Sequence, residues 1–568
     1  MSAERARWRG VFLLVCFALA GAALEGRILY LQLVNKEFLT EQANGRHLRT
    51  VQISAHRGTI TDRYGEPLAV STPVDSIWAN PQEFKPALDE LPKLAKVLDV
   101  DDEWLARRIT SNLDREFVYL KRHLPPSESE QVVKLGLPGI GTLREYRRYY
   151  PAGEVTGHFL GFTDVDDLGQ EGLELEFDHW LNGQSGSKRV LQDRLGRVIE
   201  DVELISAARP GRDLRTSIDL RLQYLAYREL KLAVGDGRAR SGSAVILDPG
   251  TGEVLAMVNQ PSFNPNNRAD LIPDKYRNRA ITDIFEPGSS FKPLILAAAL
   301  EGGNYTPTTI IDTSPGVLRV GNRILTQDSS NLGRIDLTTV LAVSSDVGTA
   351  RVALTMEPDS IWRVLTALGV GQLSASGFPG ESAGRLDDPQ HWRTVGQATL
   401  SYGYGVAVTA LQLARAYAAI AANGVLRPVS MVALDEPPAG ERAISAKTAE
   451  ELRSMLEAVV SPRGTGQRAA VKNYRIAGKT GTSRKAEAGG YDNQRHTAVF
   501  AGMAPASRPR LVVAVVINEP QGDAYYGGDV AAPVFANIVS GALRVLAVPP
   551  DALPAEPLTV IAQARVDP

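Results

Sequence analysis

Short apolar runs near the two ends of the C-terminal half of the chain predict a single β-sheet. They occupy residues 243–248, 253–258, 476–482, 497–503 and 511–518. The first two are joined by Pro-Gly-Thr-Gly at 249–252, which is a hairpin signal. We therefore expect five strands of an antiparallel sheet, contributed by both ends of one domain, with helices inserted between them.

Helical patterns fill the stretch between these two groups of strands. Residues 409–422 are largely apolar, and Gly424 follows them as a C-terminal stop. Another helix is expected to start after Asp219. The mixture of antiparallel strands and inserted helices indicates an α+β domain.

The N-terminus predicts a membrane anchor. Three arginines, at positions 5, 7 and 9, precede the uncharged residues 10–24, and the apolar pattern resumes at 28–34. The uncharged run alone would span only about 22 Å as a helix, short of a hydrocarbon core of roughly 30 Å. We therefore expect a cytoplasmic N-terminus at 1–9 and an uncleaved anchor at 10–34. The alternative is a cleavable signal peptide, because Ala-Gly-Ala at 20–22 resembles a cleavage site.

Composition argues against several classes of function. The net charge of −3 gives no basis for binding nucleic acid. The seven histidines are scattered, without a His-Glu-x-x-His motif, and Cys16 is the single cysteine. We therefore expect no metal site, no cofactor and no intrachain disulfide.

The remaining sequence predicts the domain organisation. Residues 35–210 are polar with short strand and helix signals, and Arg-Pro-Gly-Arg at 209–212 indicates a boundary. The domain with the five strands then extends over 211–548. The last residues, 549–568, are rich in proline and alanine, and we expect a flexible tail.

Ser289 and Lys292 stand three residues apart where a helix is expected to begin. Glu-Pro-Gly at 286–288 breaks the chain, an apolar run at 294–300 follows, and Pro293 is tolerated in a first turn. On a helix, positions i and i+3 face the same side with Cβ atoms about 5–6 Å apart. A buried lysine can lose its charge and act as a base. The pair therefore predicts a serine nucleophile that is activated by lysine.

Two similar signals have other interpretations. A second Ser-x-x-Lys match, from Ser185 to Lys188, lies in a polar Gly/Ser-rich stretch that we interpret as a solvated loop. Gly-Lys-Thr at 478–480 mimics the end of a phosphate-binding loop. The first glycine of that motif would fall at Asn473, and a strand pattern follows instead of a helix. The nucleotide-binding interpretation therefore fails.

Two downstream elements complete the group of reactive residues. Ser344 begins Ser-Ser-Asp and supplies a second hydroxyl, and residues 479–482 are Lys-Thr-Gly-Thr. The second element is expected to form an edge strand beside the serine. Its glycine, Gly481, has no Cβ and would let a substrate backbone approach closely. Lys479 and the threonine hydroxyls suit a carboxylate, and a strand N–H with that of Ser289 would form an oxyanion hole.

With these elements in this order, the chain resembles a class B penicillin-binding protein, most like the division-specific (FtsI-like) type. Further matching motifs stand at 57–65, 147–151, 157–158, 169–174, 193–196, 248–257, 377–381, 401–405, 525–528 and 532–535. The resemblance covers nearly the whole chain. It implies the penicillin-binding transpeptidase fold, a five-stranded antiparallel sheet with helices on both sides. An elongated pedestal domain of the dimerisation type and a single transmembrane helix would precede it.

The resemblance also implies catalytic roles. Ser289 would be acylated by the D-Ala-D-Ala end of a peptidoglycan stem peptide, with Lys292 as the general base. Ser344 and Lys479 would relay the proton to the leaving D-alanine. An amine from a neighbouring stem peptide would then complete a 4→3 cross-link.

Substrate-binding roles follow from the same resemblance. Thr480 and Thr482 would hold the substrate carboxylate beside Gly481, and the N–H of Thr482 would join the oxyanion hole. Tyr525 and Tyr526 would form an aromatic wall of the cleft, although ordinary loop packing is an alternative for this pair.

Asp346 departs from the family pattern, in which the second element ends in asparagine. An asparagine both donates and accepts hydrogen bonds, whereas an ionised aspartate only accepts. Its charge beside Lys292 and Lys479 would favour the charged lysines and oppose the base role. We therefore expect altered substrate or β-lactam affinity, with activity favoured at acidic pH. The alternative is that Asp346 turns toward the lysines and works as well as asparagine.

The function predicted by the resemblance is septal D,D-transpeptidation, covalently inhibited by β-lactams. Alternatives are a D,D-carboxypeptidase or β-lactamase, and a low-turnover division scaffold or β-lactam sensor. The expected partners are stem peptides, the membrane, a polytopic glycosyltransferase and division-complex proteins. The expected location is the bacterial inner membrane, with one membrane pass and a periplasmic catalytic domain.

Overall fold

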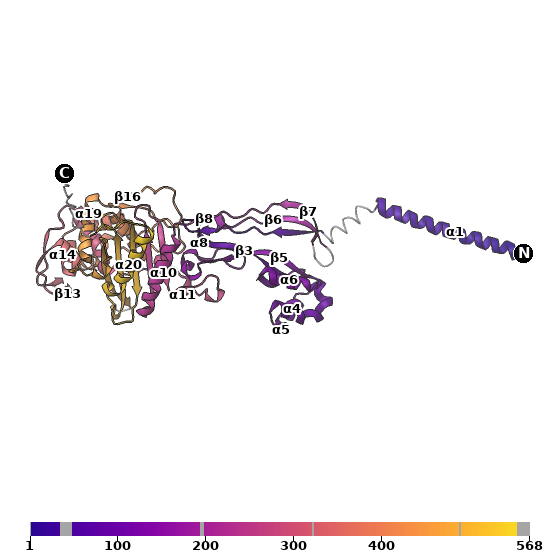
Figure 1. Cartoon of the computed structure of the whole chain (residues 1–568), viewed down its shortest axis with the longest axis horizontal. Coiled ribbons are helices and arrows are strands. Elements are labelled where there is room, and N and C mark those ends of the chain that lie inside the picture. The colour runs from indigo at the N-terminus through magenta and orange to yellow at the C-terminus, as the bar shows by residue number, and fades with distance from the viewer. Residues whose placement is uncertain (1, 35–47, 193–197, 321–322, 488–489, 554–568) are drawn as a thin grey trace, which may run out of the picture. The chain divides into compact units, whose positions relative to one another are not determined.

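The computed structural model describes residues 2–34, 48–192, 198–320, 323–487 and 490–553 (Figure 1). The motif expected at 193–196 and the end of the expected tail, from 554 onward, lie outside these residues. The chain forms two compact units. Unit 1 comprises Met1–Arg57, Ser71–Arg147 and Asn182–Gly211, and unit 2 comprises Gly58–Val70, Arg148–Leu181 and Arg212–Pro568. The domain limits expected near 210 and 548 stay predictions.

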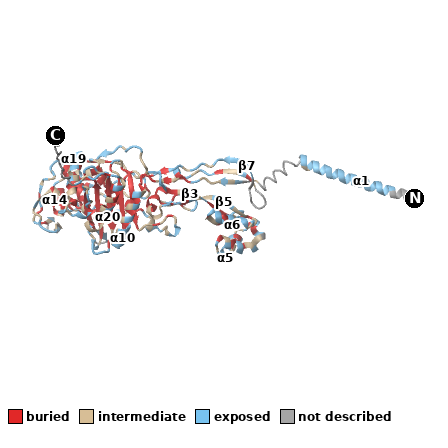
Figure 2. Cartoon of the chain, viewed as in Figure 1, coloured by how far each residue is buried: buried red, intermediate tan, exposed pale blue. Residues whose placement is uncertain are grey.

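The N-terminal segment is helical. Helix α1 (Ser2–Leu29) continues into a π-helical turn, η1 (Tyr30–Val34). Within them, Arg7–Leu33 is long and apolar enough to cross a membrane, and its residues are exposed (Figure 2). This helix fits a single-pass membrane anchor, as the apolar pattern predicted.

Unit 1 contains a three-stranded antiparallel sheet in the order β1 (Leu48–Ile53), β6 (Gly186–Gln192) and β7 (Val198–Ser206). The loop predicted at Ser185–Lys188 is therefore wrong, because residues 186–188 begin β6. Lys188 forms an ion pair of 2.8 Å with Asp201 on β7. The sequence pattern looked like a loop because most side chains here are polar, and pairing with the distant β1 supplies the strand.

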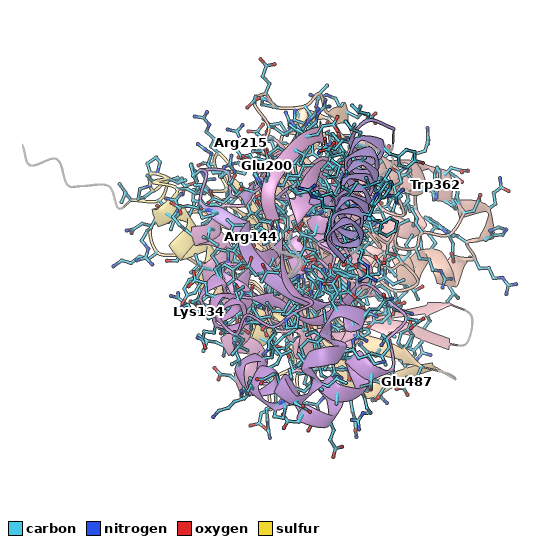
Figure 3. All side chains as sticks on the ribbon, turned by 90° about the vertical axis from the view of Figure 1, so that its right-hand side faces the viewer. Lys134, Arg144, Glu200, Arg215, Trp362 and Glu487 are labelled. Atoms are coloured by element: carbon cyan, nitrogen blue, oxygen red, sulfur yellow. The ribbon has the colours of Figure 1, made fainter. Side chains whose placement is uncertain are left out.

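The rest of unit 1 is a small α+β body. Residues 71–79 of β3 (Pro67–Ala79) pair with β4 (Val118–Leu124) and β5 (Ile140–Tyr149). The helices are α3 (Pro81–Phe84), η2 (Lys85–Glu90), α4 (Leu91–Leu98), α5 (Asp102–Thr110) and α6 (Pro126–Lys134). They enclose a core that includes Phe84 and Leu94. Charged side chains such as Lys134 and Arg144 lie on the outside (Figure 3).

Unit 2 is built on the five-stranded sheet that the sequence predicted. Its order is β10 (Val254–Gln260), β9 (Ser241–Leu247), β19 (Leu511–Asn518), β18 (Gly490–Ala504) and β17 (Ala477–Glu487). All neighbouring pairs are antiparallel. This confirms the expected fold class, and it places β17 at the edge of the sheet.

Alternate residues of these strands enter two separate cores. On one face, Ala244 and Val515 pack with α10 (Leu220–Asp236) and α20 (Gly527–Val545). On the other face, Val245 and Ala514 pack with helices that include α13 (Lys292–Glu301), α18 (Ala410–Ala421) and α19 (Ala446–Val460). The period-2 alternation of strand side chains is what allows one sheet to support both layers.

Local signals explain where the main helices begin. Asp219 caps α10 through the N–H of Arg221, and Thr409 forms a capping box with Gln412 at the start of α18. Gly424 follows α18 with a φ of +85°.

The remaining elements of unit 2 connect these layers. The strands are β2 (Ile60–Thr61), β8 (Leu214–Arg215), β11 (Ile310–Asp312), β12 (Val317–Val320), β13 (Arg323–Gln327), β14 (Arg334–Asp336), β15 (Val425–Leu426) and β16 (Glu441–Arg442). The helices are η3 (Gly153–Val155), α7 (Gly157–Leu160), α8 (Gly172–Glu176), α9 (Asp178–Leu181), η4 (Arg268–Asp270), α11 (Pro273–Tyr276), α12 (Arg279–Thr282), η5 (Gly288–Phe291), α14 (Leu337–Ala342), α15 (Asp346–Leu354), α16 (Pro358–Ala367), η6 (Pro389–His391), α17 (Thr394–Leu400) and η7 (Gln467–Ala469).

A buried ion pair ties together the N-terminal segments of unit 2. The Nε of Arg148 lies 2.6 Å from Oε1 of Glu174, and the two side chains are 1% and 0% exposed. Arg148 also donates to the carbonyl oxygen of Gly58 at 2.7 Å. Both residues belong to motifs noted in the sequence, and this contact gives those motifs a structural role.

Candidate active site

Ser289 lies in the 3₁₀ turn η5, which leads directly into α13. The sequence predicted a helix starting at Gly288 or Ser289, and the α-helical part begins at Lys292, with Pro293 in its first turn. Side chains at i and i+3 eclipse one another on a 3₁₀ turn. Ser289 and Lys292 therefore share one side of this turn, as their spacing predicted.

Glycines allow the turn to sit tightly against its neighbours. Gly288 has a φ of +54°, and a Cβ added to it would stand 2.8 Å from the carbonyl oxygen of Thr482 on β17. A Cβ on Gly403 would stand 2.1 Å from the carbonyl oxygen of Gly288. Close backbone packing thus accounts for Gly288 in Glu-Pro-Gly and for Gly403 in the motif at 401–405.

Lys292 is fully buried, and its ammonium contacts three oxygen atoms. Its Nζ donates to the carbonyl oxygen of Ser344 at 2.5 Å and to the Ser344 hydroxyl at 3.1 Å. It also lies 2.6 Å from Oδ1 of Asp346. An ammonium has three N–H donors, so these contacts use its full donor capacity.

The Ser344 hydroxyl joins the two lysines. Its Oγ accepts from Nζ of Lys479 at 3.0 Å as well as from Lys292. Lys479 also contacts Oγ1 of Thr480 at 3.2 Å. The structure therefore brings together three of the expected catalytic residues through one hydroxyl.

The environment of Lys479 opposes its charge. Burial lowers the pKa of Lys479 well below its usual range, and the nearby charge of Lys292 lowers it further. The carboxylate of Asp346 acts in the opposite direction. Lys479 is therefore more easily deprotonated than an exposed lysine.

Ser344 is held in an unusual backbone conformation. Its φ is +64°, in the left-handed region that non-glycine residues rarely adopt. The next residue, Ser345, caps α15 by accepting from the N–H of Gly348 at 2.9 Å. Asp328 accepts from the Ser345 hydroxyl at 2.5 Å and from the N–H of Asp346 at 2.8 Å. These bonds fix the strained segment and so aim the Ser344 hydroxyl.

The strand β17 runs along the other side of the site. A Cβ on Gly481 would stand 2.5 Å from the carbonyl oxygen of Pro287, so the close approach at this glycine is made by the Ser289 segment of the chain itself. We had expected a substrate to make that approach. Thr480 shares a hydrogen bond of 3.0 Å with Thr465, and the Thr482 hydroxyl accepts from the N–H of Gly527 at 2.9 Å.

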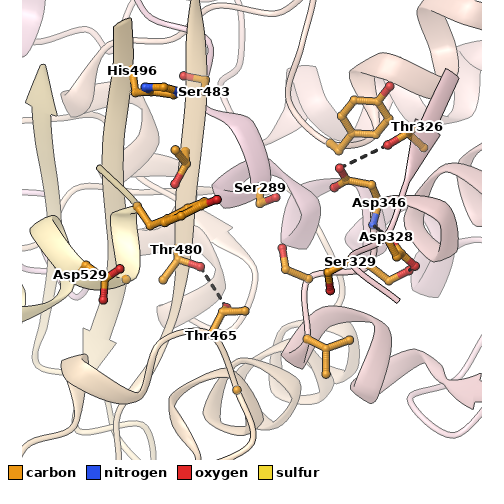
Figure 4. A pocket seen from close by; sticks show the side chains of 18 of the residues that line it. Ser289, Thr326, Asp328, Ser329, Asp346, Thr465, Thr480, Ser483, His496 and Asp529 are labelled. Atoms are coloured by element: carbon orange, nitrogen blue, oxygen red, sulfur yellow. Dashed lines mark hydrogen bonds between the residues drawn. The ribbon is translucent and has the colours of Figure 1, made fainter. Parts of the chain in front are cut away.

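Ser289 opens onto a cavity of about 1040 Å³ (Figure 4). The cavity brings together all but three of the expected site residues. Its lining includes Ser289, Ser344, Asp346, Thr480, Thr482, Tyr525 and Tyr526. Lys292, Lys479 and Gly481 lie behind this lining, where the lysines contact the Ser344 hydroxyl.

Asp346 spans the space between the lysine and the cavity. Its Oδ1 faces Lys292, and its Oδ2 accepts from the Thr326 hydroxyl at 3.3 Å. The side chain is 34% exposed. Asp346 thus turns toward a lysine, as one of the two sequence hypotheses proposed.

The two tyrosines form an aromatic group with a histidine. The Tyr525 ring stacks on His496 with centroids 4.2 Å apart and lies 4.4 Å from the Tyr526 ring. Tyr526 is 56% exposed. These rings border the cavity beside β17, which is compatible with a wall of the cleft.

Several polar residues of the cavity were not singled out from the sequence. They are Thr326, Asp328, Thr465, Arg484, Tyr402 and Tyr404. Burial, followed by the charge of Asp346, raises the pKa of Tyr402 above its usual range. The two tyrosines belong to the motif at 401–405, which was a usable signal. Nothing in the local sequence of Asp328 marks it, because its partners lie in another segment.

Two protein families match this chain. Residues 242–540 match the family described as "Penicillin binding protein transpeptidase domain". Residues 52–216 match the "Penicillin-binding Protein dimerisation domain". Together they cover the site described above and most of the segment that precedes it.

Curated relatives are similar over nearly their whole length. The chain is 44% identical over 551 residues to a peptidoglycan D,D-transpeptidase FtsI from Escherichia coli, covering 96% of this chain and 93% of that protein. It is 41% identical over 558 residues to a probable peptidoglycan D,D-transpeptidase PbpC from Pseudomonas aeruginosa, with 98% of both chains covered.

Solved structures have the same architecture. A peptidoglycan synthetase from Bifidobacterium adolescentis is 25% identical with a TM-score of 0.70, covering 90% of this chain and 98% of that one. Penicillin binding protein 3 from Mycobacterium tuberculosis, complexed with aztreonam, is 28% identical with a TM-score of 0.68, covering 88% and 98%. With the geometry of the site, these similarities confirm the resemblance: the chain belongs to the class B penicillin-binding proteins, which join a dimerisation domain to a transpeptidase domain.

Proposed function

We propose that this protein is a peptidoglycan D,D-transpeptidase that cross-links stem peptides through an acyl-enzyme on Ser289. The observation that carries the proposal is the Ser344 hydroxyl, which accepts from both buried lysines beside the cavity that Ser289 lines. The names of the similar curated proteins support the same activity.

In the acylation step, the Ser289 oxygen attacks the carbonyl carbon of the penultimate D-alanine, and Lys292 accepts the hydroxyl proton. The amide bond to the terminal D-alanine then breaks. Its nitrogen receives a proton through Ser344, which Lys292 and Lys479 can both recharge because both contact its Oγ. The lowered pKa of Lys479 supports this relay.

The oxyanion would be bound by the N–H groups of Ser289 and Thr482. In an antiparallel strand, the N–H and C=O of one residue point to the same side. The carbonyl of Thr482 faces Gly288, since a Cβ there would meet it at 2.8 Å. The N–H of Thr482 therefore faces the Ser289 turn as well, where it could stabilise a developing negative charge.

The substrate carboxylate would bind near Thr480 and Thr482, whose hydroxyl groups can donate to it, with Lys479 directly behind Thr480. Tyr525 and Tyr526 would border the stem peptide. An amine from a second stem peptide would attack the acyl-enzyme, forming the new amide bond and releasing Ser289. A β-lactam would acylate Ser289 in the same way and block it.

The N-terminal segment supports the location, and the family resemblance supports the partners. Arginines ahead of the apolar helix favour a cytoplasmic N-terminus at 1–9, an anchor at 10–34, and a periplasmic pedestal and catalytic domain at 35–210 and 211–548. In this orientation the protein would be anchored in the bacterial inner membrane, and it would act on the peptidoglycan of the septum. A polytopic glycosyltransferase and other division proteins would be its partners, contacted through the helix and pedestal.

The test is covalent labelling of the detergent-solubilised full chain with a fluorescent penicillin, followed by incubation with paired stem peptides. We expect labelling that Ser289→Ala abolishes, and cross-linked dimers that penicillin suppresses. Free D-alanine without dimers would indicate hydrolysis instead of cross-linking. A folded protein that neither labels nor forms dimers would refute the proposal.

A further inference from the structure

The resting site holds Lys292 in contacts that exclude the base role. Its three N–H donors face the Ser344 carbonyl oxygen, the Ser344 hydroxyl and Oδ1 of Asp346. A lysine with all three donors in use has no lone pair to accept a proton. To activate Ser289, it must first lose a proton.

Ser289 shows the complementary feature. Among the residues that the structure describes, its hydroxyl forms no hydrogen bond, although Lys292 follows three positions later on the same side of the turn. The nucleophile and its base are therefore disengaged, and the shortest side-chain contact of the base is to Asp346 at 2.6 Å.

We propose that Asp346 is a substrate-operated proton acceptor that keeps Lys292 inactive until a substrate amide enters the site. The inference rests on the proposed function above. In the resting enzyme, the carboxylate pairs with the ammonium. When the substrate arrives, the proton moves from Nζ of Lys292 to Oδ1 of Asp346. The resulting carboxylic acid donates its O–H to the substrate amide oxygen, a hydrogen bond that an asparagine N–H could also donate.

The step balances without any outside acid or base. One N–H bond of Lys292 breaks and one O–H bond of Asp346 forms, so an ion pair becomes a neutral pair with the same number of protons. The amide oxygen replaces Lys292 as the partner of that O–H. The released amine then accepts the Ser289 proton while the Ser289 oxygen bonds to the substrate carbonyl carbon.

Asp346 is placed to contact both sides of this exchange. One oxygen faces the buried Lys292, and the side chain is 34% exposed and lines the cavity. The second oxygen accepts from Thr326 on β13, which fixes the plane of the carboxylate. A substrate in the cavity can therefore reach Asp346, whereas the side chain of Lys292 is fully buried.

Charged and titratable groups from four segments of the chain lie around Asp346. Lys292 comes from α13 and Lys479 from β17, and Asp328 accepts from its backbone N–H. Tyr402 and Tyr404 also feel its charge. A negatively charged substrate that enters the cavity brings a second carboxylate close to Asp346, and repulsion between the two charges favours the proposed proton transfer.

The test is the pH profile of acylation by a fluorescent penicillin between about pH 5 and pH 10, for the native chain and Asp346→Asn. In the native chain, the acylation rate should not change with pH as long as Lys292 and Asp346 together hold one proton. It should then fall by about tenfold per pH unit once both groups are deprotonated, because the O–H donor is lost. The asparagine variant keeps its N–H donor at every pH, so its alkaline fall should vanish or move to higher pH.

Asp529→Asn is the matched control, because Asp529 also lines the cavity but forms its ion pair with Arg468 and not with Lys292. It should retain the native alkaline fall. An alkaline fall at the same pH in the native chain and in Asp346→Asn, or no fall in the native chain, would overturn the inference. A native chain that is not labelled at all would instead refute the proposed function.

An infrared difference spectrum gives a direct readout. Ser289→Ala cannot be acylated, so adding benzylpenicillin to it isolates the binding step. A carbonyl band of a protonated carboxyl group should appear on binding, and it should be absent from the Ser289→Ala/Asp346→Asn double variant. A spectrum without that band, at a penicillin concentration that saturates binding, would also overturn the inference.

Discussion

Gly288→Ala should slow acylation by at least about 100-fold while the chain stays folded. The new Cβ would stand 2.8 Å from the carbonyl oxygen and 3.1 Å from the carbonyl carbon of Thr482. Both atoms belong to the backbone of β17, so no flexible side chain can move aside. The turn that carries Ser289 must shift away from the strand that would supply the second oxyanion donor.

The magnitude follows from two separate costs. A positive φ costs an alanine about 1–2 kcal/mol, partly offset by about 0.4–1 kcal/mol from a less flexible unfolded chain. Loss of one oxyanion donor costs about 2.7–4 kcal/mol in the transition state, or on the order of 100- to 1000-fold in rate. We therefore expect acylation at least about 100-fold slower, with a loss of stability of only about 1–3 kcal/mol.

Gly303→Ala is the matched control. Gly303 has a φ of +74°, but a Cβ there has no atom within 4 Å. This variant therefore has the backbone strain without the clash, and its acylation rate should stay within about threefold of the native rate. Stopped-flow or gel-based penicillin acylation, with thermal unfolding measured on the same samples, separates the two effects.

The reasoning would be refuted by a folded Gly288→Ala chain that acylates within about threefold of the native rate. It would fail equally if Gly303→Ala were slowed to the same extent, because backbone strain alone would then explain both results.

Three further predictions concern other contacts. Ser344→Ala and Ser344→Gly should both slow acylation by about 100- to 10,000-fold, because both remove the relay hydroxyl. Glycine also relieves the positive φ, so equal penicillin-labelling rates would show that the hydroxyl and not the backbone strain matters, and unequal rates would contradict this. Arg148→Met should lower the free energy of unfolding in urea by about 3–5 kcal/mol, and Arg148→Met/Glu174→Leu should recover most of it; equal losses would contradict the ion-pair argument. Arg495 lowers the pKa of Glu519 from 4.5 to about 2. The ionised Glu519 therefore stabilises the folded state above pH 4.5, and this contribution is lost as the pH falls toward 2. The difference in melting temperature between the native chain and Glu519→Gln should therefore close over that range.

The sequence predicted those parts of the fold that depend on neighbouring residues. The five strands were predicted because each is an apolar run bounded by turn residues, and all five form the sheet of unit 2. Helix α18 was predicted because it ends before Gly424, and its capping box at Thr409 is local as well. The Ser289–Lys292 pair was predicted from its spacing together with Glu-Pro-Gly before it, the apolar run after it and the two downstream elements.

What the sequence did not predict depends on contacts between distant segments. The polar side chains of β6 predict a loop. The segment forms a strand because it pairs with β1, which lies far away in the chain, and with β7. The close approach at Gly481 was assigned to a substrate, whereas the backbone of Pro287 makes it. The orientation of Asp346 was left open between two hypotheses, because it depends on where α13 places Lys292.

These distant contacts explain how a strained site persists. Ser344 has a left-handed backbone that costs of order 1–3 kcal/mol, which a short motif cannot supply by itself. Asp328 holds the following residues by bonds to Ser345 and Asp346, and Lys292 holds the Ser344 carbonyl oxygen from another helix. The proposed proton transfer takes the N–H that faces Asp346 and leaves the one that holds the Ser344 carbonyl oxygen, so the strained segment stays fixed while the base is freed. The Ser344 hydroxyl therefore keeps its contacts with both lysines, and the same hydroxyl serves the proton relay to the leaving nitrogen.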